Sequence, residues 1–204
     1  GTNPRIAGTD YAKLSATGEF VALTTAEALL PGDNDSFFDV YRWERNTGDL
    51  TLVSVNASTS VYSTLDISGD GRFVLFASPA ADLVAGDTNG AWDVFLRDVV
   101  NSTTERVNLA DDESQAVAPA GGDAFIEGGV SEDGRYVVFS TRATNLRPSD
   151  TDGDPDIFIR DRQSGTTTPI TPNVTDGGSR LAGVSTAASV VLYTTPPGGF
   201  MLWR

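Results

Sequence analysis

A short sequence pattern occurs four times in this chain, and this repeat is the strongest constraint on its fold. The pattern reads LSATGEFVALTT from Leu14, ISGDGRFVLFAS from Ile67 and VSEDGRYVVFST from Val130, and a degraded copy, VSTAASVVLYTT, begins at Val184. The serines of the four copies are spaced by 53, 63 and 54 residues. A period of this length indicates a repeat architecture, in which each copy forms one supersecondary unit.

Each copy predicts four short antiparallel strands. The first strand ends at the repeat serine, and a tight turn at Thr17-Gly18, Asp70-Gly71 or Asp133-Gly134 leads into an almost entirely apolar second strand. A third strand follows an acidic loop, and a hairpin leads into the fourth. We expect the second strands at Phe20–Thr24, Phe73–Ser78 and Tyr136–Thr141, the third at Val40–Trp43, Val94–Arg97 and Ile157–Arg160, and the fourth at Leu50–Val55, Glu105–Leu109 and Thr168–Thr171.

Four antiparallel strands in roughly fifty residues are typical of one blade of a β-propeller. The prediction is therefore an all-β fold, with a single domain over residues 1–204 and blades at about 10–55, 62–109, 125–172 and 178–204. The fourth copy supplies only three strands, whereas residues 4–9 form an extra strand that could complete its blade. We expect four blades closed by this N-terminal strand, because closure removes exposed edges. The alternatives are a part of a larger propeller, or one ring shared by two chains.

An acidic loop precedes the third strand in three copies: GDNDSFFD from Gly32, GDTNGAWD from Gly86 and SDTDGDPD from Ser149. Carboxylate and amide oxygens at alternate positions of a tight loop converge, and hard oxygen ligands suit Ca²⁺. We expect calcium in these loops, most strongly in the third, which carries one more carboxylate. The alternative is that the same side chains form Asx turns with the loop's own amides. The candidate ligands are Asp33, Asp35 and Asp39; Asp87, Asn89 and Asp93; and Asp150, Asp152, Asp154 and Asp156.

A further acid follows each loop, at Glu44, Asp98 and Asp161, at the position of the bidentate glutamate in an EF-hand. Here an extended strand would carry that side chain about 17 Å from the loop, at ~3.3 Å per residue. We therefore leave it out of the ligand set and expect it to bond within the turn between the third and fourth strands.

The composition excludes several classes of function. The chain has neither Cys nor His, which removes thiolate sites, Ser-His-Asp catalysis and most zinc sites. A net charge of −14 disfavours nucleic acid, and no apolar run is long enough to cross a membrane. An enzyme would have to use carboxylates alone, as glycosidases do. The first strands supply Asp10, Asp66 and Glu127 without a repeated pair, so we expect no catalysis, with a carboxylate-dependent glycan-active enzyme as the alternative.

The combined motif SxDGRxVxFxS, GDTNGxxDVFxRD and TTxRV resembles the TolB-type, WD-repeat-like β-propeller repeat of bacterial proteins. This resemblance implies a propeller scaffold used for binding, often outside the cytoplasm. We expect a non-catalytic, calcium-stabilised binding or structural module that is extracellular, on the cell surface or periplasmic. Its partner would be a protein or a glycan, with no nucleic acid and no membrane insertion. Self-assembly by strand exchange would follow if the N-terminal strand paired with a neighbour.

The one irregular spacing comes from an acidic insertion over residues 110–129. In a propeller, the loops after the fourth and the second strands emerge on the same face. The insertion is therefore predicted to lie beside the acidic loops, where a long loop on a rigid scaffold could bind a partner. The alternative is a flexible, solvated connection.

Overall fold

The computed structural model describes residues 9–61, 63–117, 127–147, 153–171, 178–195 and 198–204, and these residues form antiparallel β-sheets without a helix. The first two sheets contain β1 (Thr9–Leu14), β2 (Phe20–Thr25), β3 (Asp39–Glu44) and β4 (Leu50–Leu52), then β5 (Ser63–Ile67), β6 (Phe73–Ser78), β7 (Asp93–Asp98) and β8 (Thr103–Arg106). The other two contain β9 (Gly128–Val130), β10 (Tyr136–Thr141), β11 (Asp156–Asp161) and β12 (Thr166–Pro169), then β13 (Arg180–Val184), β14 (Val191–Thr194) and β15 (Phe200–Trp203).

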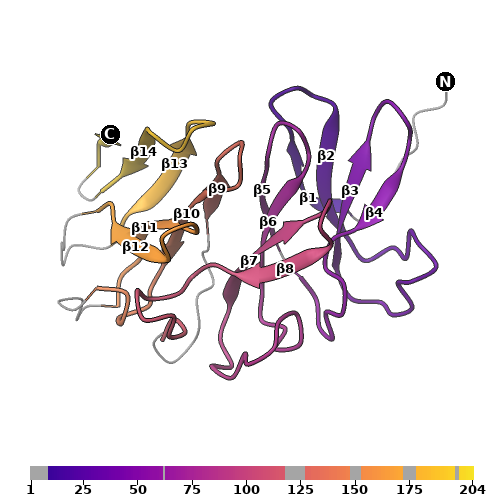
Figure 1. Ribbon diagram of the computed structural model, residues 1–204, viewed down its shortest axis with the longest axis horizontal. Coiled ribbons are helices and arrows are strands. Elements are labelled where there is room, and N and C mark those ends of the chain that lie inside the picture. The colour runs from indigo at the N-terminus through magenta and orange to yellow at the C-terminus, as the bar shows by residue number, and fades with distance from the viewer. Residues whose placement is uncertain (1–8, 62, 118–126, 148–152, 172–177, 196–197) are drawn as a thin grey trace.

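The strand order confirms the prediction of propeller blades. Three sheets have four strands in sequence order, and the fourth has the order β13-β14-β15. The first blade lies at one end of the long axis of the molecule, the second in the middle, and the third and fourth at the other end (Figure 1). The predicted closure by residues 4–9 lies outside the described residues, except that Thr9 belongs to β1 and pairs with Thr25.

The fourth strand of each of the first three blades ends earlier than predicted, because a side chain takes over its place in the ladder. The amide of Val94 donates to Asn108 Oδ1 at 3.0 Å, where a continuing strand would offer a carbonyl. Ser54 and Thr171 accept the equivalent amides of Val40 and Ile157 at 3.0 and 3.1 Å. The backbone is then free to leave the sheet and cross to the next blade.

The hydrophobic core consists of layers between successive blades. Because neighbouring residues of a strand point to opposite faces, each middle strand contributes to two layers, and β6 is buried along its whole length. Phe76 packs toward the first blade, whereas its neighbour Leu75 packs toward the third. A third layer joins Val138 and Ile157 to Val191 and Tyr193 of the fourth blade.

The turn glycines let successive blades approach closely. Gly71 has a φ of +70°, which favours glycine, and a Cβ there would lie 2.3 Å from the ring of Phe20 in the preceding blade. Gly134 repeats this contact with Phe73. Glu132 adds hydrogen bonds from the amides of Gly69 and Asp70, at 2.8 and 3.0 Å. The described residues include no helix that could span a membrane.

Candidate metal site in the blade loops

The last candidate ligand of each acidic loop is the first residue of a third strand. Asp39, Asp93 and Asp156 begin β3, β7 and β11, and each pairs with the end of the preceding strand. Each carboxylate also accepts a hydrogen bond from the side chain that follows the fourth strand: Ser54 on Asp39, Asn108 on Asp93 at 2.7 Å, and Thr171 on Asp156 at 2.7 Å. The repeat therefore places the same carboxylate in the same backbone frame three times.

The first loop brings its three predicted ligands together. One carboxylate oxygen from each of Asp33, Asp35 and Asp39 lies within 4.8 Å of the others. Asp33 and Asp39 are buried, and Asp35 is exposed. The amide of Asp35 donates to Asp33 Oδ1 at 3.4 Å, and that of Phe37 to Asp35 Oδ1 at 2.8 Å. The Asx turns of the alternative hypothesis are thus present, together with the carboxylate cluster.

Among the described residues, the carboxylates of this cluster have no basic partner. In the described part of the chain, none of the three carboxylates forms an ion pair with an arginine or lysine. Burial, together with the charges of Asp33 and Asp35, raises the pKa of Asp39 to about 6. Burial and the hydrogen bond to Asp33 raise the pKa of Tyr41 as well, so its hydroxyl stays a proton donor. The site concentrates negative charge that a bound cation would neutralise.

In the second loop, an arginine occupies the equivalent space. Arg106, the last residue of β8, places Nη1 at 3.1 Å from Asp87 Oδ1 and 3.6 Å from Asp93 Oδ2, with Asp93 0% exposed. Asn89 turns its amide nitrogen toward Asp93 Oδ1, at 3.2 Å, and its oxygen accepts the amide of Ala91. Burial still raises the pKa of Asp93 to about 6, against the lowering effects of Asn108, Arg106 and Asn89. The predicted ligands converge here around a guanidinium.

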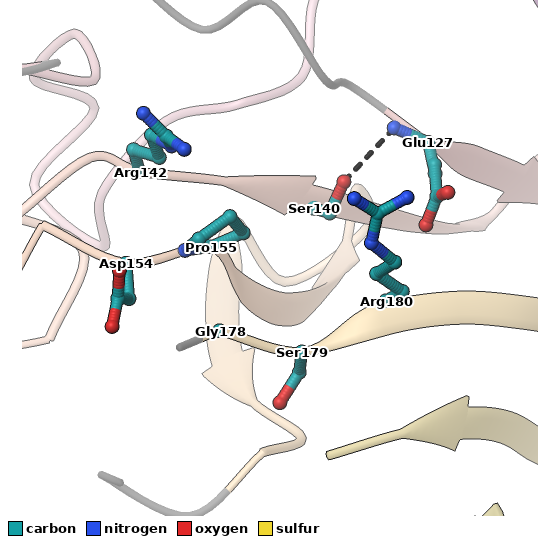
Figure 2. A pocket seen from close by; sticks show the side chains of 8 residues that line it. All are labelled: Glu127, Ser140, Arg142, Asp154, Pro155, Gly178, Ser179 and Arg180. Carbon is teal, nitrogen blue, oxygen red and sulfur yellow. Dashed lines mark hydrogen bonds between the residues drawn. The ribbon is translucent and has the colours of Figure 1, made fainter. Parts of the chain in front are cut away.

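The third loop also has an arginine beside its last carboxylate. Arg147 Nη1 lies 3.6 Å from Asp156 Oδ2, and the same guanidinium lies over the ring of Phe158 at 5.7 Å. The predicted ligands Asp150 and Asp152 lie outside the described residues. Asp154 instead lines a pocket between the third and fourth blades, and Figure 2 shows it there with Arg142, Ser179 and Arg180.

Arg106 and Arg147 were not predicted from the sequence, because neither arginine recurs at the equivalent position of the other two copies. The strand pairing places Leu52 and Pro169 where the second blade has Arg106. Leu30 and Val84 stand three residues before the first loop acid, where the third blade has Arg147. The signal that could have found them is a charge at a position that is otherwise apolar.

The predicted role of the EF-hand-like acids in the turn is confirmed for Asp98 and Asp161. Asp98 accepts the amides of Val100 and Asn101 at 3.0 Å, and Asp161 accepts that of Gln163. Arg72, 2.7 Å away, lowers the pKa of Asp98 to about 2, and Arg135 lowers that of Asp161. Both acids hold the turn between the third and fourth strands.

The described part of the insertion lies against the second loop, as predicted. Asn89 Nδ2 donates to the carbonyl of Ala116 at 3.2 Å, and Gln115 Oε1 accepts the amide of Thr88. Glu113 pairs with Arg160 at 2.7 Å and so joins the insertion to the third blade. Residues 110–117 therefore form part of the loop surface, and residues 118–126 lie outside the described residues.

The fold is similar to known β-propellers, although no protein family and no curated protein matches the sequence. TolB from Acinetobacter baumannii has 17% identity and a TM-score of 0.56, over 97% of this chain and 41% of that one. A putative TolB from Agrobacterium tumefaciens has 14% identity and a TM-score of 0.53, over 90% and 52%. The propeller domain of the trilobed protease from Pyrococcus furiosus is described as having an open velcro topology. It has 15% identity and a TM-score of 0.56, over 100% of this chain and 56% of that one. The chain thus spans about half the length of these structures, and the TolB-type resemblance is confirmed for the fold.

Proposed function

We propose that this chain is a non-catalytic β-propeller module for binding or assembly, and that one calcium ion in its first acidic loop stabilises it. The observation that supports this proposal is the contrast among the loops. The second and third loops hold buried carboxylates beside Arg106 and Arg147, whereas Asp33, Asp35 and Asp39 have no such partner in the described residues. A guanidinium lies beside the acidic loop in two blades, and a metal cation would supply the positive charge in the remaining one.

Calcium fits the donor set of the first loop. Three carboxylates offer hard oxygen ligands, and Ca²⁺ completes a coordination of six to eight with carbonyls and water. The exposed Asp35 leaves the site open to solvent for entry of the ion. Asp39 and Asp33 come from the start of a strand and from the loop before it, so the ion would join the loop to the blade.

The proposed location is outside the cytoplasm, at the cell surface or in the periplasm. Extracellular modules typically bind calcium with a dissociation constant of ~10⁻⁴–10⁻³ M. A calcium-stabilised propeller would therefore suit a location outside the cytoplasm. The proposed partner is a protein or a glycan, held by the loop surface that residues 110–117 share with the second acidic loop. Propellers serve many functions on one scaffold, so the partner has to be found by experiment.

Thermal unfolding in calcium and in EDTA tests the proposal. Calcium at 100 times its dissociation constant adds about 2.7 kcal/mol, which raises the melting temperature by several degrees in a domain of this size. Asp35→Asn should remove this response, since it deletes an exposed ligand without disturbing the core. Asp82→Asn, a change at an acid outside the loop, is the matched control and should keep it. A wild-type protein that melts at the same temperature in calcium and EDTA contradicts the proposal.

A further inference from the structure

The first and the fourth blade each have one apolar sheet face that no other blade covers in the described part of the chain. The equivalent positions between successive blades are buried. The trailing face consists of Leu192, Phe200 and Leu202 of the fourth blade, and the leading face consists of Ala12, Leu14 and Val21 of the first blade. Phe200, Leu202 and Leu14 are 71%, 56% and 66% exposed. Phe200 and Leu202 lie on β15, where Leu202 pairs with Leu192 of β14, and Leu14 of β1 pairs with Val21 of β2. Contiguous exposed apolar patches of this kind mark interaction sites.

The trailing face is equivalent to the face of the third blade that packs against the fourth blade. Leu192 pairs with Leu202, as Val138 pairs with Ile159 in the third blade. Phe200 pairs with Thr194, as Ile157 pairs with Ser140. In the third blade, Val138, Ile157 and Ile159 pack against the fourth blade and are 0%, 0% and 7% exposed. The fourth blade presents the same type of surface to solvent.

The leading face repeats the complementary surface. Leu14 pairs with Val21, as Ile67 pairs with Val74 and Val130 with Val137. Ile67 and Val74 of the second blade, and Val130 and Val137 of the third, each pack against the preceding blade. Ile67 and Val130 are only 4% and 5% exposed. In the first blade, Val21 is half-buried and Leu14 is exposed. The chain therefore carries both halves of an interface that it already makes three times.

We propose that the trailing face of one copy packs on the leading face of a second copy, head to tail, as one blade packs on the next. This inference goes beyond the proposed function and does not depend on calcium. Continuity with the three internal interfaces supports a second copy as the occupant, because the two surfaces are complementary in the order that the chain repeats. No strand has to be exchanged. Head-to-tail contacts close into a ring when the rotation allows and otherwise extend into filaments.

Mass measurement of the protein in solution over a range of concentrations tests the association. Wild type is expected to be a dimer or a larger assembly, and Phe200→Asp and Leu202→Asp are expected to be monomers with an unchanged melting temperature. Val100→Asp is the matched control, because Val100 is 70% exposed but lies in the turn after β7, away from both faces. A wild type that is monomeric at every concentration overturns the proposal, as does a Val100→Asp variant that dissociates equally.

Engineered cysteines test the head-to-tail geometry, and the absence of native cysteine makes the experiment clean. Inside the chain, a Cβ at Gly128 would lie 2.8 Å from Leu75 Cδ2 of the preceding blade. The equivalent residues at the two ends are Ala12 and Leu192. Ala12→Cys mixed with Leu192→Cys should give a disulfide-linked dimer, and neither variant alone should do so. Cross-linking of Leu192→Cys with itself, or none in the mixture, overturns the geometry.

Discussion

The first and second acidic loops share one backbone frame and differ in what lies among their carboxylates. In the first, Asp33, Asp35 and Asp39 converge without a basic partner in the described residues, and in the second, Arg106 lies 3.1 Å from Asp87. The strand pairing aligns Arg106 with Leu52 of the first blade. A single position thus decides whether the chain supplies its own cation. A repeated acidic motif therefore need not have the same chemistry in every copy.

Removing the internal cation should have the largest effect. Arg106→Met leaves Asp87 and Asp93 buried without their partner, and breaking a buried ion pair in this way costs about 3–5 kcal/mol of unfolding free energy. Urea unfolding in EDTA measures the loss. Calcium should restore part of it, because the second loop then resembles the first.

Arg97→Met is the control for that experiment. Arg97 lies on β7 of the same blade, but its Nη1 donates to the hydroxyl of Thr104 at 3.0 Å. Its loss should cost less and give no new response to calcium. Equal losses in the two variants, with no calcium response in Arg106→Met, would contradict the role of Arg106 as the internal cation of the second loop.

In the absence of calcium, the pH dependence of stability should report on the charge of the first loop. Because the pKa of Asp39 is raised to about 6 in the folded protein, the folded state binds this proton more tightly than the unfolded chain does. The stability that it contributes is present at low pH and is lost as the pH rises through about 6. In EDTA, we expect unfolding free energy to be higher at about pH 5 than at about pH 7.5.

Asp39→Asn sharpens this test, because asparagine can still accept the hydrogen bond from Ser54 but carries no charge. In EDTA near neutral pH, the variant should be more stable than wild type by about 1 kcal/mol, since burial no longer penalises a charge. It should also show a weaker pH dependence, with the remainder due to Asp93, whose pKa is likewise about 6. An Asp39→Asn variant that is destabilised and retains the full pH dependence would contradict this explanation.

The smallest effect is expected for Asp35→Asn in the absence of calcium. Asp35 is exposed, and an asparagine oxygen can still accept the amide of Phe37. Surface changes of this kind alter stability by no more than about 0.5 kcal/mol. A larger loss in EDTA would show that the carboxylate acts within the fold itself, without calcium.

The repeat in the sequence was sufficient to predict the blades, because a strand that is buried on both faces appears as a continuous apolar run in each copy. The second strand Phe73–Ser78 was predicted to the residue. The ends of the fourth strands were wrong, because Ser54, Asn108 and Thr171 replace backbone acceptors, and periodicity carries no information on such hydrogen bonds. The arginines were missed for a related reason. Each contacts its loop from a position that is uncharged in the other copies.

The number of calcium ions bound per chain distinguishes the first loop, which is proposed to bind calcium, from the two loops that contain an arginine. Calorimetric titration of the metal-free protein should give one ion per chain in wild type and none in Asp35→Asn. Arg106→Met should bind a second ion, because its second loop has lost the internal cation. A wild type that binds no calcium, or one ion in each of the three loops, would contradict the claim that arginines take the place of calcium in the second and third loops.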